Sequence, residues 1–110
     1  MSLDADRGRV LRMFYVLYRC RVKPGSEEAF RALWSATTVA IRDGRGGLGS
    51  RLHRGDDGLH YAYARWPSRE AWAAAFALPP IDAAASAAMK EHVEEWLPAI
   101  PLEPIEDLLP

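Results

Sequence analysis

The stretch His60-Tyr-Ala-Tyr-Ala-Arg-Trp-Pro-Ser-Arg-Glu-Ala-Trp72 changes its periodicity at Pro67. Before the proline the residues alternate as in a β-strand, and aromatic side chains are frequent among them. After the proline, Ser68 can cap a helix, and Glu70 would lie in the first turn, where a negative charge is favourable. The stretch therefore predicts a strand that leads directly into a helix.

The residues before this strand predict a β-hairpin. Two alternating runs, 48–54 and 59–66, are joined by Gly55-Asp-Asp-Gly58, a sequence typical of tight turns. A two-residue turn would place His53 and His60 on the same face of the hairpin. That face would carry Arg51, His53, His60, Ala62, Ala64 and Trp66, and the other face would carry Leu48, Leu52, Leu59, Tyr61 and Tyr63. A bulge at the turn would reverse this assignment.

The N-terminal half predicts a central strand followed by an amphipathic helix. Residues 11–22 are rich in aromatic and β-branched residues, and they would place apolar side chains on both faces of a strand. Pro24-Gly25 ends this strand, and Ser26 can cap the next element. The glycine-rich stretch 43–47 ends the helix. Its apolar stripe comprises Phe30, Leu33, Trp34, Thr37 and Ile41.

The C-terminal half predicts a second helix broken by prolines and then an edge strand. The helix that begins at Ser68 runs to about residue 78, where Pro79-Pro80 breaks it. A further helical stretch would carry an apolar stripe from Ile81 to Trp96 and Leu97. Residues 99–106 predict the last strand. It contains two prolines, which a sheet tolerates at an edge.

The resulting order, β-α-β-β-α-β with the second helix split, is typical of the ferredoxin-like α+β fold with one four-stranded antiparallel sheet. In that topology the first and third strands are central and the last is an edge strand. Two helices cover one face of the sheet, and large apolar residues remain on the other face. We therefore expect a homodimer in which the sheets pack face to face. Residues 1–10 are expected to form a flexible N-terminal segment, and 11–110 a single domain.

Composition excludes several classes of function. The chain has 110 residues and a net charge of -1, and its basic residues form no run, which argues against nucleic-acid binding. Cys20 is the single cysteine, so no intrachain disulfide or cysteine-based zinc site is expected. The first residues lack the layout of a signal peptide, and no apolar run is long enough to span a membrane. These features predict a cytoplasmic protein.

Two motifs carry a resemblance to a known family. Val22-Lys-Pro-Gly-Ser-Glu-Glu-Ala-Phe30 is followed by a glycine-rich link, a hairpin, and Tyr63-Ala-Arg-Trp-Pro-Ser-Arg-Glu-Ala-Trp72. Over roughly residues 12–106, this arrangement resembles the antibiotic biosynthesis monooxygenase (ABM) family of dimeric α/β barrels. The resemblance implies that fold and a range of activities, which include cofactor-independent oxygenation of aromatic polyketide-like compounds, quinol oxygenation and haem degradation. The haem-degrading members use an Asn–Trp–His set, and this sequence contains no asparagine.

Candidate site residues follow from what a cofactor-free oxygenase requires. Such an enzyme needs a base, an apolar pocket that excludes water, and space for O2. Histidine is the natural base because its pKa lies near neutrality. We therefore expect His60 and His53 as catalytic residues, with two small alanines leaving space beside them. The expected substrate-binding residues are Trp66, Tyr63, Arg51 and His92.

Each candidate also has a purely structural interpretation. His92 would equally serve as a hydrogen-bonded packing residue, and the His53/His60 pair as a solvated contact near the hairpin tip. The three histidines have no metal-site spacing and no accompanying carboxylate, so neither a metal nor another cofactor is predicted. The favoured function is monooxygenation of a small phenol-, quinol- or polyketide-like aromatic compound. The alternatives are a non-catalytic ligand-binding or dimerisation domain, and an isomerase or cyclase on the same fold.

Overall fold

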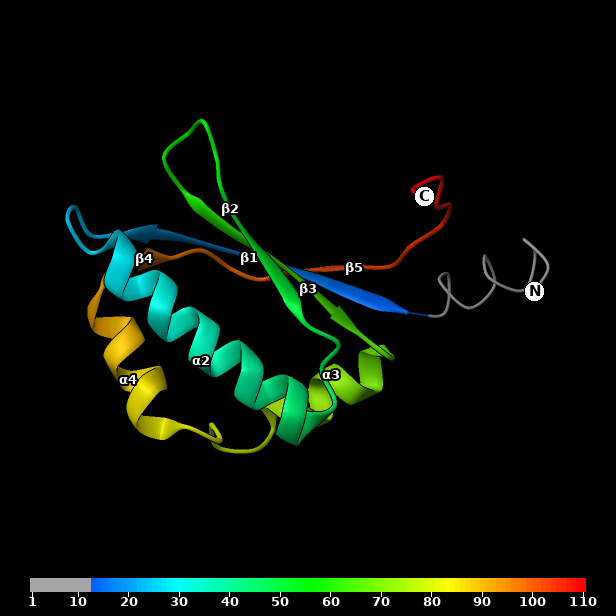
Figure 1. The fold of residues 1–110 in the computed structure, drawn as a ribbon. Helices are drawn as coiled ribbons and strands as arrows, with labels where there is room; N and C mark the ends of the chain where they lie inside the picture. The colour runs from blue at the N-terminus through cyan, green and yellow to red at the C-terminus, as the bar shows by residue number, and fades with distance from the viewer. Residues whose placement is uncertain (1–12) are drawn as a thin grey trace.

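A computed structural model describes residues 13–110 of the chain (Figure 1). The predicted flexible segment 1–10, and the first two residues of the strand predicted over 11–22, lie outside the described residues. The elements in chain order are β1 (Phe14–Val22), α2 (Glu27–Arg45), β2 (Ser50–Arg54), β3 (His60–Trp66), α3 (Arg69–Phe76), α4 (Ala83–Glu91), β4 (Val93–Trp96) and β5 (Ile100–Leu102).

The strands form one antiparallel sheet in the order β2-β3-β1-β4, and β5 also pairs with β1. The predicted central positions of the first and third strands are confirmed. The sheet has five strands instead of the predicted four, because the last edge is built from two short segments. The β4 strand pairs with the C-terminal end of β1, and β5 pairs with its N-terminal half, where Pro101 lies opposite Val16. Proline is thus confined to the edge, as expected.

The strand-to-helix junction at Pro67 forms as predicted. Ser68 adopts an extended conformation, and its Oγ accepts a hydrogen bond from the backbone N–H of Ala71 at 3.0 Å. The helix α4 is capped in the same way by Asp82, which accepts a bond from the N–H of Ala85 at 2.9 Å. Ser26 precedes α2 but makes no capping bond with its side chain.

The helical stretch predicted up to Trp96 and Leu97 is wrong beyond Glu91. His92 ends α4, and Val93 begins β4, where it pairs with Val22. The alanine-rich sequence of α4 favours a helix but leaves little apolar surface to extend it, whereas Val93 is buried in the core when it joins the sheet. Pairing along the free edge of β1 therefore replaces the last helical turns.

The hairpin register differs from the predicted one. His53 pairs with Tyr61, and Arg54 pairs with His60, so the turn contains three residues, Asp56-Asp57-Gly58. Gly58 has φ +82°, the left-handed conformation that a three-residue hairpin loop with a bulge requires. The face assignment is therefore reversed for β2. Leu52 and Ser50 lie on the face of His60, while His53 and Arg51 lie on the opposite face.

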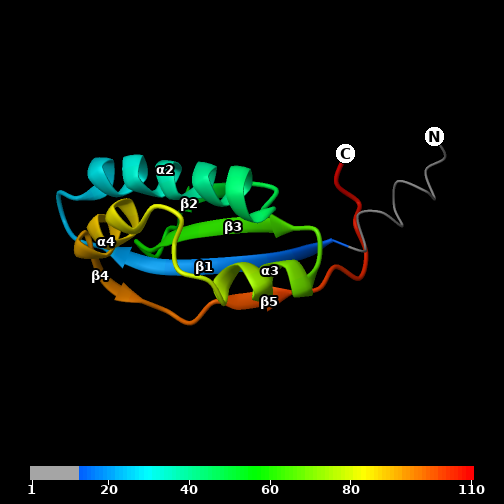
Figure 2. The same cartoon turned by 90° about the horizontal axis from the view of Figure 1, so that it is seen from below.

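All three helices lie on one side of the sheet, as Figures 1 and 2 show from two directions. The side chains between sheet and helices form two buried clusters. One contains Phe14, Val16, Ala64 and Trp66, and the other contains Cys20, Val22, Phe30 and Val93. Among residues 13–110, no helix covers the opposite face of the sheet. Across the same residues, none of the helices combines the length and hydrophobicity of a membrane-spanning segment.

Candidate functional site

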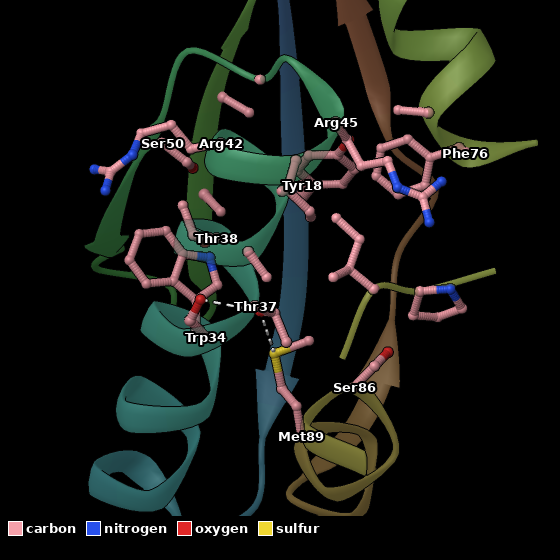
Figure 3. Close-up of a pocket in the computed structure, with 18 of the residues that line it drawn as sticks. Tyr18, Trp34, Thr37, Thr38, Arg42, Arg45, Ser50, Phe76, Ser86 and Met89 are labelled. Atoms are coloured by element: carbon pink, nitrogen blue, oxygen red, sulfur yellow. Dashed lines mark hydrogen bonds between the residues drawn. The ribbon is translucent and has the colours of Figure 1, made fainter. Parts of the chain in front are cut away.

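A partly open cavity of about 490 Å³ lies between the inner face of the sheet and the three helices (Figure 3). Side chains from β1, β2 and β3 form its floor, and α2, α3, α4 and the segment between α3 and α4 form its walls. The lining is mostly apolar and rich in aromatic rings. Ala62 and Ala64 are buried in the floor, where their small side chains leave space, as the sequence predicts. A cavity of this size accommodates a small organic molecule.

His60 lies at one end of this cavity and is only 8% exposed. Its ring packs edge-on against Phe30 with centroids 5.4 Å apart, and its Nδ1 is buried without a hydrogen-bond partner in the described structure. Burial lowers the pKa of His60 below its usual value, the charge of Arg54 acts in the same direction, and Glu27 opposes them. The imidazole is therefore neutral at neutral pH and can accept a proton.

Trp66 lies at the other end and is 2% exposed. It contacts Phe76 of α3 with ring centroids 6.0 Å apart, and its Nε1 is buried without a partner. His60 and Trp66 are the first and last residues of the seven-residue strand β3. With a rise of about 3.4 Å per residue, their Cα atoms lie roughly 20 Å apart. One small ring therefore cannot contact both side chains, although both line the same cavity.

Tyr18 lines the middle of the cavity and is not among the site residues predicted from the sequence. It lies opposite Ala62 in the sheet, and its hydroxyl accepts a hydrogen bond from Nε1 of Trp72 at 2.9 Å. Burial raises the pKa of Tyr18 to about 12, and the bond from Trp72 opposes this rise. The phenol therefore stays protonated and can donate its own hydrogen to an acceptor in the cavity.

Two further polar groups of the lining were not predicted. Nη1 of Arg45 and Oγ of Ser50 are buried and have no partner among the described residues. Figure 3 shows both residues at the end of the cavity that also holds Phe76, while Trp34 and Met89 lie toward the other end. The sequence signal was weak, because an arginine in the last turn of a helix usually interacts with the helix dipole.

Four predicted site residues do not line this cavity. Arg51 and Tyr63 pair with each other on the outer face of the sheet, where Tyr63 stacks on Tyr15 with ring centroids 5.2 Å apart. His53 is exposed on that face as well. His92 ends α4, and its Nδ1 lies 3.0 Å from Oγ of Ser26. His92, predicted either to bind substrate or to serve in packing, thus lies outside the lining of this cavity, in a position that suits packing.

His53 and His60 still border a common feature, a shallow depression of about 200 Å³ at the N-terminal end of α2. Glu27, Glu28 and Arg31 complete its rim. Within residues 13–110, no group of three or more His, Cys, Asp or Glu side chains is placed to hold a metal ion. Cys20 lies opposite His60, and burial raises the pKa of its thiol to about 11. The thiol is therefore a poor nucleophile at neutral pH.

Comparison with known proteins is consistent with this geometry. Residues 13–95 match the pattern of the family described as antibiotic biosynthesis monooxygenase. No curated protein matches the chain. Among solved structures, a monooxygenase from the gene ActVA-Orf6 of Streptomyces coelicolor, determined in complex with the ligand nanaomycin D, has a TM-score of 0.73 at 22% identity and covers 94% of this chain and 96% of its own.

Two further solved structures share the fold. SnoaB, a cofactor-independent oxygenase from Streptomyces nogalater, has a TM-score of 0.72 at 17% identity and covers 88% of this chain and 97% of its own. Rv0793 from Mycobacterium tuberculosis has a TM-score of 0.68 at 22% identity and covers 88% of this chain and 99% of its own. At these identities the similarity establishes the fold, which is the predicted ferredoxin-like α+β arrangement.

Proposed function

Because the chain belongs to the antibiotic biosynthesis monooxygenase family, we propose that it oxidises a phenol-, quinol- or polyketide-like aromatic compound with O2, without a metal or flavin. The observation that carries the proposal is the buried, unpartnered Nδ1 of His60 in a large, mostly apolar cavity. An unprotonated imidazole in such a setting can take the proton of a phenol and so produce the phenolate, which is the electron-rich form that reacts with O2. The structural neighbour SnoaB, described as a cofactor-independent oxygenase, supports the same class of reaction.

The proposed reaction converts a phenol with a free para carbon, plus O2, into a para-quinone and water. Nδ1 of His60 takes the phenol proton, the para carbon bonds to O2, and the protonated imidazole returns the proton to the resulting peroxide. Loss of the ring C–H proton to His60 then forms the carbonyl and breaks the O–O bond. The departing hydroxide takes up that proton and becomes water, so O2 is the only oxidant that the reaction requires.

The aromatic lining supports this reaction in two ways. Phe30, which packs edge-on against His60, and the neighbouring Ala62 are buried and apolar, so they exclude water from the peroxide. Tyr18, held protonated by burial, can donate a hydrogen bond to an oxygen of the substrate. In this arrangement His60 is the catalytic base, Trp66 is part of the pocket wall, and Tyr18 positions the substrate.

Oxygen consumption tests the proposal. We expect uptake of O2 with some members of a panel of 1-naphthols and anthrones, whose para carbon carries a hydrogen, and appearance of the quinone in equal amounts. With isotopically labelled O2, one labelled atom should enter the quinone and the other should appear in water. Stabilisation of the protein by these compounds in a thermal-shift assay, with neither O2 uptake nor product, would contradict catalysis and favour a ligand-binding domain.

The outer face of the sheet supports a homodimer as the working form of the protein. Tyr63 is 39% exposed there, and Ile100 and Leu102 of β5 pair with β1 on the same face and are also exposed. A second copy that packs its sheet against this face would bury these side chains. Sedimentation velocity should give the mass of a dimer for the wild type, and Tyr63→Asp should shift it toward the monomer. A monomeric wild type at micromolar concentration would contradict this part of the proposal.

A further inference from the structure

Arg45, the last residue of α2, presents a charged group to the cavity. Its Nη2 donates a hydrogen bond to the backbone carbonyl of Pro79 at 2.8 Å, in the segment between α3 and α4. Its Nη1 is buried and has no partner among residues 13–110. Because the guanidinium is planar and rigid, the bond to Pro79 fixes the direction of the remaining N–H groups. Nη1 therefore keeps a hydrogen-bonding capacity that no described residue uses.

No described carboxylate forms an ion pair with this group. Asp82 also lines the cavity, and its side chain accepts the capping bond of α4. Asp43 pairs with the exposed Arg42 at 3.2 Å. Within the described residues no salt bridge involves Arg45. A buried charged donor without an acceptor is unfavourable, and an anionic ligand would remove this cost.

Two further hydrogen-bonding groups lie at the same end of the cavity. Nε1 of Trp66 and Oγ of Ser50 are buried and unpartnered. Gly47, two residues after Arg45, packs against Trp66, since a Cβ added at this glycine would lie 3.5 Å from Cη2 of the indole. Figure 3 shows Arg45 and Ser50 at this end of the cavity. The guanidinium, the indole and the hydroxyl can all donate, which suits a ligand that only accepts.

Aromatic rings form the walls beside these donors. The rings of Tyr18 and Phe76 are 6.2 Å apart, and Trp66 contacts Phe76 as well. We propose that this end of the cavity binds the carboxylate of an aromatic acid, with the carboxylate on Arg45 and the ring system against Tyr18 and Phe76. The planar carboxylate matches the guanidinium geometry. The carboxylate site deepens the proposed function, because it names aromatic acids as the substrate class. It rests on that function only in that both use the same cavity.

Binding of a matched pair of probes tests the carboxylate site. The probes are 2-naphthoate and 2-naphthamide, which have nearly the same shape, differ in charge, and carry no phenol. By isothermal titration calorimetry we expect the wild type to bind the acid about 10- to 100-fold more tightly than the amide, the range for a hydrogen bond to a charged group. Arg45→Gln should abolish this preference and leave binding of the amide unchanged. Arg31→Gln, the matched control, changes an exposed arginine of the same helix that does not line this cavity and should retain the preference.

Several outcomes would overturn the carboxylate site. Equal affinity of the wild type for acid and amide would do so, as would failure of both to bind at their solubility limits. Equal weakening of both probes in Arg45→Gln would show that Arg45 only holds the segment at Pro79. If Arg45→Gln does not fold, Arg45→Lys serves as the second variant. A lysine cannot bridge Pro79 and the ligand in the same way, so the preference for the acid should fall about tenfold, and an unchanged preference would overturn the proposal.

The test separates this site from the proposed reaction. Because neither probe has a phenol to oxidise, their binding does not depend on oxygenation. Preference for the acid without O2 uptake on any phenol would refute the reaction and retain the carboxylate site. O2 uptake on neutral phenols, together with equal binding of the acid and the amide, would support the reaction and refute the carboxylate site.

Discussion

The two faces of the sheet are formed by the same strands and differ in what lies against them. On the inner face the small side chains of Ala62 and Ala64 leave a cavity beneath the helices, and His60 and Trp66 lie at its two ends. On the outer face no helix of the described chain covers the strands, and Tyr15 and Tyr63 stack on each other. The alternation of small and large residues along β3 thus leaves a cavity on the inner face and an aromatic surface without a covering helix on the outer face.

The largest expected contrast between the faces is in activity. His60→Gln removes the base from the inner face, and we expect oxygen uptake with the best substrate to fall about 10²- to 10⁴-fold. The matched change His53→Gln alters the outer face and should leave the rate unchanged. Comparable losses in both variants would show that the shallow depression between the two histidines, and not the main cavity, holds the substrate.

Stability should show the next contrast. Trp66→Ala removes a fully buried indole from the inner core, and we expect it to lower the free energy of unfolding by about 3–5 kcal/mol. Tyr63→Ala, made in a Leu102→Asp background that keeps the protein monomeric, removes a partly exposed ring and should lower it by about 1 kcal/mol. Urea denaturation followed by tryptophan fluorescence or circular dichroism measures both. Similar losses would indicate that the outer tyrosines form a core of their own.

A smaller contrast is expected between two tyrosine hydroxyls. Tyr18→Phe leaves Nε1 of Trp72 without its acceptor on the inner face, so unfolding should become easier by about 1–3 kcal/mol. Tyr15→Phe on the outer face should change stability by less than about 0.5 kcal/mol. In the proposed site Tyr18 also positions the substrate, so its variant should raise KM, which a loss of stability alone would not do. An unchanged KM would remove Tyr18 from the binding site.

The smallest effect concerns pH. The pKa of His60 is lowered in the folded protein, so the unfolded chain binds more protons as pH falls through the ordinary histidine value of 6.5. The free energy of unfolding that depends on neutral His60 is fully present above that value. It falls as the pH is lowered and stops falling once the imidazole of the folded protein is also protonated. Thermal unfolding between pH 7.5 and pH 5.5, roughly one unit on either side of that value, should show a steeper decline for the wild type than for His60→Gln. Parallel curves would show that His60 is solvated.

Much of the fold could be predicted from the sequence because local signals agree with the tertiary structure. The alternation before Pro67, the cap at Ser68 and the apolar stripe of α2 each lead to one element. The end of α4 could not be predicted, since its alanine-rich sequence is compatible with a longer helix until the free edge of β1 is considered. Similarly, Gly55-Asp-Asp-Gly58 permits turns of two or three residues. The two turn lengths direct opposite faces of β2 toward the helices.

The site could be predicted only in part, because its members come from distant segments. His60 and Trp66 could be predicted because they are chemically capable residues at the ends of one strand, and both line the cavity. Arg45 and Tyr18 were overlooked, because their importance depends on bonds to Pro79 and Trp72 that no local pattern encodes. Predicted roles for Arg51 and Tyr63 in binding do not fit their outward position.

The three-residue loop Asp56-Asp57-Gly58 determines which side chains of β2 reach the cavity. Since side chains alternate along a strand, a shift of the pairing by one residue exchanges the two faces of β2. In this same sequence, a two-residue turn with Gly55 opposite Gly58 would pair His53 with His60 and rotate Leu52 to the outside. Such a shift would exchange an apolar floor residue for a second titratable group in the cavity. The left-handed conformation of Gly58 therefore influences the chemistry of the site from an exposed turn.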